Sequence, residues 1–308
     1  MASVMEGAVA TPGRAESGSR PGVLATEALL LLMAVIWGVN FSVVKFGVSE
    51  IAPLAYNGLR VAAAAAALLL VGALAVRERW PGRRDTLALL ALGVLGNCVY
   101  QVFFIEGMAR TGAGTAALIL AAGPAVIALL GRLRGVERVT RRGAVGIALS
   151  IAGVALVMFG TGAAAGRSSL VGDLLLFGGC VAWSVFTVLL TPYTQRVDGV
   201  HLSALTMAGG AVPMLAVAGP ELGAMSWAAV TVRGWGAVAY SSLAALVVAY
   251  LIWYRGVRVI GPTRTALFGN LQPFIALVVA WLAFGEVPTA VQAVGAVAIM
   301  IGIVLTRR

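Results

Sequence analysis

Residues 112–124 read GAGTAALILAAGP, and residues 261–273 read GPTRTALFGNLQP. A shift of 149 residues superimposes these two stretches, so that Gly112 falls on Gly261 and Pro124 falls on Pro273. The same shift aligns five further pairs, which are Gly107 with Gly256, Glu137 with Glu286, Thr140 with Thr289, Gly146 with Gly295, and Gly153 with Gly302. Because chance rarely aligns seven such pairs, we infer that the chain contains an internal duplication.

The duplication extends to the beginning of each half. A shift of 146 residues pairs Trp37 with Trp183 and Glu27 with Asp173, so the second half repeats the first with a small change in length. Residues 1–22 carry Gly, Ser, Pro and Arg without apolar periodicity, which is typical of a disordered tail. We therefore expect four segments, namely a disordered cytoplasmic tail over 1–26, a first five-helix repeat over 27–160, a linker over 161–169 and a second five-helix repeat over 170–308.

The composition excludes a soluble globular protein. Of the 308 residues, 60% are hydrophobic and only 11% are charged, and the mean hydropathy is +0.98. A bilayer core needs roughly 20 apolar helical residues per span, and lipid-exposed backbone must form its hydrogen bonds within the span. We expect an all-α integral membrane protein of ten transmembrane helices, near residues 28–46, 52–76, 86–108, 112–131, 143–160, 170–191, 200–218, 235–254, 260–283 and 287–306.

Basic residues indicate the orientation of these spans. With ten spans, sixteen of the 22 Lys and Arg fall on one side and four on the other, which places both termini in the cytoplasm. This role in topology explains the net charge of +10 better than nucleic-acid binding does, so we expect a lipid bilayer and no nucleic acid as partner.

The number of spans in each half has a consequence for function. Five is odd, so the second half enters the membrane in the opposite sense to the first, and the two repeats are inverted. Inverted repeats allow a carrier to expose one midplane site alternately to each side of the membrane. We therefore expect a transporter of a small-molecule substrate.

A doubled motif connects the chain to a known family. The first half carries Trp37-Gly38-Val39-Asn40-Phe41, then Pro124, then Glu137, and the second half repeats this order with Trp183, Pro273 and Glu286. Over about residues 27–306 the chain resembles the drug/metabolite transporter superfamily and, within it, the ten-span EamA-type permeases. The second repeat carries Ser184 and Phe186 where the first has Gly38 and Asn40, so we do not assume a symmetric site.

The resemblance also implies a substrate class and a location. The chain looks like a bacterial amino-acid exporter of the aromatic-amino-acid type, in the inner membrane. A multidrug permease and a permease for other metabolites, such as sugars or nucleobases, are the alternatives within the superfamily. The resemblance leaves the oligomeric state open between monomer and homodimer.

Polar and aromatic residues inside the spans are the candidates for the substrate site. In the third span, the spacing of Asn97, Tyr100, Gln101 and Phe104 places them on one helical face near mid-membrane. Trp253 and Tyr254 lie near the cytoplasmic end, where an interfacial aromatic belt is the favoured interpretation. The full set of candidates is Trp37, Asn40, Asn97, Tyr100, Gln101, Trp183, Tyr250, Asn270 and Gln272.

These candidates have a structural interpretation too, since Asn and Gln can join helices and aromatic rings can fill a core. The prolines inside the spans also allow two interpretations. Pro124 and Pro273, with Gly123 and Gly269 nearby, should kink the fourth and ninth spans and act either as paired hinges or as static kinks. The glycines Gly146, Gly153, Gly295 and Gly302 suit close helix contact within or between molecules.

Charged residues near the membrane complete the prediction. We expect Arg60 and Arg264 to snorkel or to pair at helix ends, with a substrate carboxylate as the alternative partner. Glu106 should form a surface ion pair with Lys45 or Arg110. Glu137 and Glu286 should stabilise the N-termini of the last span of each half. Because no carboxylate falls near mid-span, facilitated diffusion or exchange is favoured over proton coupling.

An enzyme, a receptor or retinal protein and a channel are the rival classes, and ten spans count against a receptor. No HExxH or GxSxG motif occurs, and the single histidine, His201, lies at a helix end. Cys98 and Cys180 both lie in apolar stretches, where a buried thiol is expected rather than a disulfide or metal site. We therefore expect no catalytic residues, no cofactor and no metal. The sequence also lacks the charge rings and filter motifs of channels.

Overall fold

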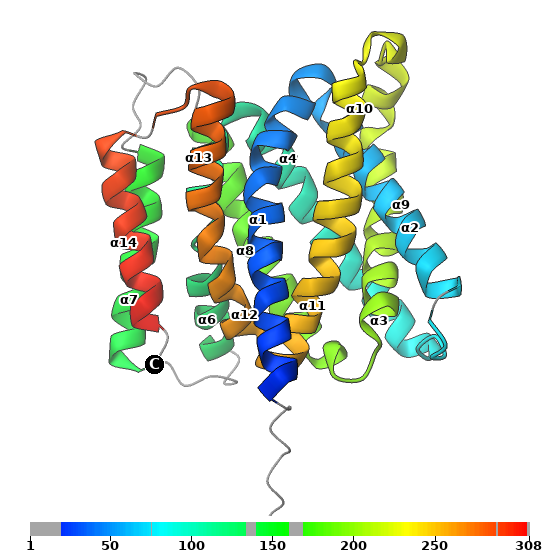
Figure 1. The fold of residues 1–308 in the computed structure, drawn as a ribbon, viewed down its shortest axis with the longest axis horizontal. Helices are drawn as coiled ribbons and strands as arrows, with labels where there is room; N and C mark the ends of the chain where they lie inside the picture. The colour runs from blue at the N-terminus through cyan, green and yellow to red at the C-terminus, as the bar shows by residue number, and fades with distance from the viewer. Residues whose placement is uncertain (1–19, 75, 134–139, 160–168, 288, 307–308) are drawn as a thin grey trace, which may run out of the picture.

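The computed structural model describes residues 20–74, 76–133, 140–159, 169–287 and 289–306, and their regular elements are all helices (Figure 1). In the first repeat, the third span is continuous but changes to a π-helix at its centre, and the fourth span is broken in two. The elements are α1 (Arg20–Glu50), α2 (Pro53–Leu74), α3 (Arg83–Val94), a π-helix (Leu95–Val99), α4 (Tyr100–Arg110), α5 (Ala113–Leu120), α6 (Gly123–Leu133) and α7 (Arg141–Phe159).

The second repeat has the same plan. Its third span again contains a π-helix, and its fourth span is again interrupted. The elements are α8 (Leu170–Thr194), α9 (Gly199–Ala224), a 3-10 turn (Trp227–Ala229), α10 (Val232–Ala239), a π-helix (Tyr240–Val248), α11 (Ala249–Ile260), α12 (Pro262–Phe268), a 3-10 turn (Gly269–Leu271), α13 (Gln272–Phe284) and α14 (Ala290–Thr306).

The helices have the lengths and apolar character of membrane spans. Within the described residues, eight helices or chains of joined helices are long and apolar enough to cross a membrane. The other two are α7 and α14, and α14 contains a shorter apolar stretch over Ala290–Gly302. This confirms the predicted all-α membrane protein of ten helices in two repeats.

The two repeats run in opposite directions. Near the end of α1, the Lys45 ammonium donates to the Thr111 carbonyl at 2.8 Å. At the start of α8, the Ser169 amide donates to the neighbouring Arg110 carbonyl at 3.1 Å. The end of α1 and the start of α8 therefore lie at the same end of the bundle, although both are first helices of a repeat. In Figure 1, α1 begins and α14 ends at the opposite end.

The start of the first helix differs from the prediction. Residues 1–19 of the expected tail lie outside the described part of the chain, but α1 already begins at Arg20. Polar contacts hold this additional turn against the bundle. The Thr26 hydroxyl donates to the Gly22 carbonyl at 2.8 Å and accepts from Arg255 Nε at 3.1 Å. The expected linker also falls outside the described residues, except for Ser169, whose hydroxyl caps α8.

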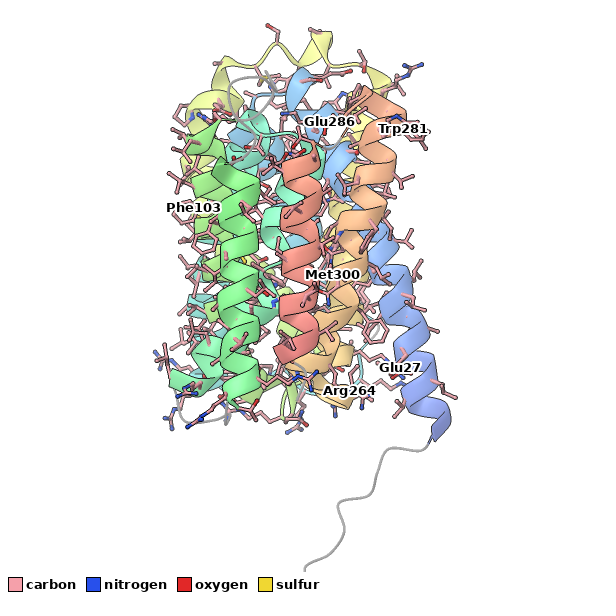
Figure 2. The ribbon with its side chains drawn as sticks, turned by 90° about the vertical axis from the view of Figure 1, so that its left-hand side faces the viewer. Glu27, Phe103, Arg264, Trp281, Glu286 and Met300 are labelled. Atoms are coloured by element: carbon pink, nitrogen blue, oxygen red, sulfur yellow. The ribbon has the colours of Figure 1, made fainter. Side chains whose placement is uncertain are left out.

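The fifth helices of the two repeats pack against each other at one edge of the bundle (Figures 1 and 2). Their glycines allow the backbones to touch: a Cβ atom added to Gly153 would lie 2.7 Å from the Gly295 carbonyl oxygen. The Ser150 hydroxyl donates to the Ile299 carbonyl at 3.3 Å across the same contact. The glycine strips of the sequence therefore serve contact within one molecule.

Candidate functional site

A cavity of about 110 Å³ lies between the two repeats. Since one water molecule requires roughly 10–15 Å³ on this measure, the cavity has room for several waters or part of a small substrate. Both repeats contribute to its wall. The aromatic and polar side chains that line it are Trp37, Asn40, Phe41, Arg60, Tyr100, Gln101, Phe104, Cys180, Trp183, Tyr250, Trp253, Asn270 and Gln272.

Tryptophan and tyrosine rings form the apolar part of the wall. The ring of Trp183 lies 5.1 Å from that of Tyr100, 5.4 Å from that of Tyr250 and 5.8 Å from that of Trp253. Trp37 closes the group, with its ring 5.6 Å from Trp253. These separations are typical of favourable aromatic pairs. The result is a packed aromatic surface against which an apolar side chain can pack.

Trp37 also makes a polar contact with the other repeat. Its indole Nε1 donates to the Ala245 carbonyl at 2.9 Å, inside the π-helix Tyr240–Val248. A π-helix shifts its hydrogen bonds by one residue relative to an α-helix and often occurs at functional sites. A shift of 149 residues places the first repeat's π-helix, Leu95–Val99, on residues 244–248 of the second. The duplication therefore includes the π-helices.

A chain of hydrogen bonds crosses the cavity wall from one repeat to the other. The Arg60 Nη2 donates to Gln101 Oε1 at 3.2 Å, and Gln101 Nε2 donates to the Tyr250 hydroxyl at 3.4 Å. Gln101 and Tyr250 are separated by 149 residues and are thus equivalent positions of the two repeats. Nearby, Asn40 Oδ1 accepts from the Ser241 hydroxyl at 2.9 Å.

The broken fourth and ninth spans bring backbone to the cavity. The fourth span breaks between α5 and α6, and Pro124 is the second residue of α6; the ninth passes through the turn Gly269–Leu271, and Pro273 is the second residue of α13. Each proline lacks the amide that a continuous helix would use. Gly123, Pro124 and Gly269 line the cavity, whereas Pro273 is buried at the start of α13 and is not among the lining residues. The two breaks occur where the sequence predicted kinks.

Eight of the nine candidate side chains line the cavity, and the exception is Asn97. It is fully buried in the π-helix Leu95–Val99, against Gly210 of α9. The predicted face assumed 3.6 residues per turn from Asn97 to Tyr100 and Gln101. The wider π-helical turn rotates Asn97 away from that face.

Several lining residues were missed or interpreted differently. Trp253 was expected in an interfacial belt, but it is only 3% exposed and lines the cavity, while Tyr254 is buried without lining it. The repeat could have indicated Trp253, because a shift of 149 residues places Phe104 on it. Arg60 was expected to snorkel or pair at a helix end, but it is 2% exposed and faces the cavity. Phe41 and Cys180 were not proposed as site residues.

The carboxylates of the described chain lie away from the cavity, and several of them accept hydrogen bonds from backbone amides at the ends of helices. Glu286 was expected to stabilise α14, but its carboxylate accepts from the Gly114 amide at 3.3 Å, in the first turn of α5. Thr289 and Gln292 cap α14 instead, through mutual side chain to amide hydrogen bonds. Figure 2 shows Glu286 at the end of the molecule opposite Glu27 and Arg264. Glu137 lies outside the described residues.

The remaining carboxylates have partners at the helix ends or are exposed. Glu106 pairs with Arg110 as expected, whereas Lys45 donates to backbone carbonyls at the end of α4. Arg264 pairs with Glu27 at 3.3 Å, in agreement with the predicted helix-end pairing. The others are Glu50 bonded to Thr231, Glu78 in an exposed loop, Asp85 paired with Arg196, Asp173 bonded to Thr111, Asp198 capping α9 and Glu221 bonded to the first amides of α2.

The cavity therefore holds one cation and no carboxylate among the residues that the structure describes. In the same part of the chain, no group of three or more His, Cys, Asp or Glu side chains could hold a metal ion. Cys98 and Cys180 are buried free thiols, as predicted. Such a wall can bind a solute through ring packing and hydrogen bonds.

Inverted halves around a shared cavity define the chain as a membrane transporter, and comparison with known proteins identifies its family. The model of the EamA-like transporter family matches residues 24–159 and again residues 170–308. The chain belongs to this family. It is a secondary transporter of the drug/metabolite transporter superfamily and not an enzyme.

Relatives cover nearly the whole chain. An uncharacterized transporter of Bacillus subtilis, YyaM, is 28% identical over 89% of this chain and 91% of its own length. A probable terminal-alkyne amino-acid exporter of Streptantibioticus cattleyicolor is 29% identical over 91% of this chain and 92% of its own length. A solved crystal structure superimposes with a TM-score of 0.64 over 92% of this chain and 96% of that chain. At 17% identity, this likeness concerns the fold alone.

Proposed function

We propose that this transporter exports small polar metabolites, and amino acids in particular, by alternating access of the cavity between its repeats. The observation that carries the proposal is the position of the cavity. Equivalent residues of the inverted halves, such as Gln101 and Tyr250, meet at its wall, and a broken helix from each half borders it. Exchange of the conformations of the two halves would then open the cavity to the other side.

Two observations support amino acids as the substrate class. The Streptantibioticus relative, 29% identical, is named as a probable terminal-alkyne amino-acid exporter. The cavity combines packed aromatic rings with the amide side chains of Asn40, Gln101 and Asn270. Rings can hold an apolar side chain, and amides can bond to a polar backbone. A multidrug, sugar or nucleobase permease is the alternative.

The energetics and the cellular setting belong to the same proposal. With no carboxylate among the described cavity residues, exchange or facilitated diffusion accounts for transport without a proton relay. Replacing Glu106 with Gln should leave transport and its pH response nearly intact, because this residue pairs with Arg110 at the surface. We place the protein in a bacterial inner membrane with both termini in the cytoplasm, as a monomer or homodimer.

Counterflow in liposomes tests the substrate class. Purified protein would be reconstituted with one unlabelled amino acid inside, and uptake of the same labelled amino acid would be measured for a panel of twenty. We expect saturable uptake that needs internal substrate and that related amino acids inhibit. Folded protein that accumulates none of them, but accumulates a labelled sugar, nucleobase or cationic dye, would replace the amino-acid proposal by the corresponding alternative.

A further inference from the structure

Arg60 lies in α2 and is the only charged side chain that lines the cavity within the described residues. It is 2% exposed, and it ranks among the largest fully buried side chains of the described structure. Its Nη2 donates to Gln101 Oε1 at 3.2 Å, and its guanidinium carbon lies 5.5 Å from the centre of the Phe104 ring. Its Nε and Nη1 atoms have no hydrogen-bond partner.

An arginine in this position requires a negative partner. Guanidinium stays protonated in proteins, so Arg60 cannot avoid the cost of burial by losing its charge. A ring face and one neutral amide oxygen compensate a buried cation only in part. The carboxylates of the described chain lie at helix ends or on the surface, and none lines the cavity. The unused donors of Arg60 therefore remain for a ligand.

A second unpartnered side chain faces the same cavity from the other repeat. Asn270 lies in the turn Gly269–Leu271 that interrupts the ninth span, and it is 3% exposed. Neither its amide nitrogen nor its amide oxygen has a hydrogen-bond partner. Buried polar groups without partners are costly and rare. The cavity thus presents unused hydrogen-bonding groups from both halves of the molecule.

We propose that Arg60 binds a carboxylate of the transported molecule, and that this carboxylate is the obligatory recognition element of the substrate. The planar fork of guanidinium suits a carboxylate, which accepts two parallel hydrogen bonds. No acidic side chain of the described cavity wall offers an ion pair to an ammonium group, so we expect an amino group of the substrate to contribute less to binding than the carboxylate. This inference rests on the proposed transport function and narrows its substrate class to organic carboxylates, including 2-oxo acids.

Matched triplets of ligands test the inference by binding alone. Each triplet holds an amino acid, the 2-oxo acid with the same side chain and the amine without the carboxylate, for the side chains of phenylalanine, leucine and glutamine. The thermal unfolding midpoint of the detergent-purified protein would be measured with each ligand, since a ligand of the folded state raises it. For at least one triplet, we expect the amino acid and the 2-oxo acid to raise the unfolding midpoint. The amine should leave the midpoint unchanged.

Arg60 variants connect that binding to the guanidinium. In Arg60→Gln the ligand-induced rise should disappear, and in Arg60→Lys it should persist at about tenfold higher ligand concentration, because charge remains but the fork is lost. Arg264→Gln, which removes a surface arginine, should respond as the wild type does. Without ligand, Arg60→Gln should unfold at the wild-type temperature or higher, since it removes an uncompensated buried charge.

The outcomes separate this inference from the proposed function. The carboxylate anchor would be overturned if the amines raised the unfolding midpoint as much as the amino acids and 2-oxo acids do. It would also be overturned if the amino acids and 2-oxo acids raised the midpoint of Arg60→Gln as much as that of the wild type. Either result would hold even if transport is confirmed. Lack of stabilisation by all nine compounds would overturn the carboxylate anchor as well. A lower unfolding temperature of ligand-free Arg60→Gln would assign Arg60 a structural role. Failure of counterflow, with acid binding intact, would instead remove the transport proposal.

Discussion

Trp37 illustrates how single residues of this chain combine packing and polar contacts. Its ring packs against Trp183, Tyr250 and Trp253, and its indole N–H bonds to a carbonyl of the opposite repeat. The sequence indicated Trp37 through its repeated motif. The hydrogen bond could not be predicted, because it depends on the π-helix that turns the Ala245 carbonyl toward the cavity.

Truncation of this residue tests the aromatic wall. We expect Trp37→Ala to raise the half-saturation concentration for the transported substrate by about tenfold or more, since loss of roughly 1.4 kcal/mol of binding has that effect. The half-saturation concentration of Trp37→Phe should lie between those of Trp37→Ala and the wild type, because phenylalanine keeps an aromatic ring. Liposome uptake kinetics supply the measurement. Trp235→Ala, at an exposed tryptophan outside the cavity, is the control, and equal effects of both alanine variants would contradict the assignment.

The orientation of Arg60 was not predicted from the sequence. A position two turns into a span suggested snorkelling, since a single sequence does not tell which side of a helix faces lipid. The structure packs that side of α2 toward the cavity and Phe104. Trp253 was misjudged for a related reason, because depth near the end of a span does not distinguish a lipid-facing belt from a protein interior.

At the scale of the element, the broken spans are the parts that the sequence predicted best. A proline removes a backbone hydrogen bond wherever it lies inside a helix, so its effect is local and can be predicted from the sequence alone. The π-helices lack such a signal. They lie between α3 and α4 and between α10 and α11, and the wider turn of the first shifted the face predicted for Asn97.

Replacing the prolines tests their proposed role as hinges. Pro124→Ala and Pro273→Ala restore an amide donor and should stiffen the fourth and ninth spans. We expect each to slow the maximal transport rate by several-fold while substrate affinity stays near the wild-type value. Pro213→Ala, inside α9 and away from the cavity wall, provides the matched control. Wild-type rates in both hinge variants would favour static kinks.

The contact of α7 with α14 allows a second test at this scale. Gly153→Ala would place its new Cβ 2.7 Å from the Gly295 carbonyl oxygen, and such overpacking costs about 1–3 kcal/mol. We expect a lower thermal unfolding midpoint than that of the wild type. Gly219→Ala in α9, where a Cβ would meet nothing within 4 Å, should instead be neutral or slightly stabilising. A stable Gly153→Ala protein would show that the two helices can move apart at little cost.

At the scale of the whole molecule, the inverted repeats organise the fold. The apolar runs predicted ten helices, and the shift of 149 residues together with the odd number of spans per half predicted two opposed halves. The same shift did not reveal how the halves approach each other. Contacts such as Gln101 with Tyr250, and Glu286 with the first turn of α5, had to come from the structure.

The central proposal is that the cavity between the repeats is exposed alternately to each side of the membrane. Cys180 lines this cavity and is a natural reporter in a Cys98→Ser background. In liposomes with the protein in one known orientation, an impermeant maleimide would be applied from outside or trapped inside, with and without substrate. We expect Cys180 to react from both sides and substrate to slow both reactions. Reaction from a single side, unaffected by any transported substrate, would contradict alternating access through this cavity.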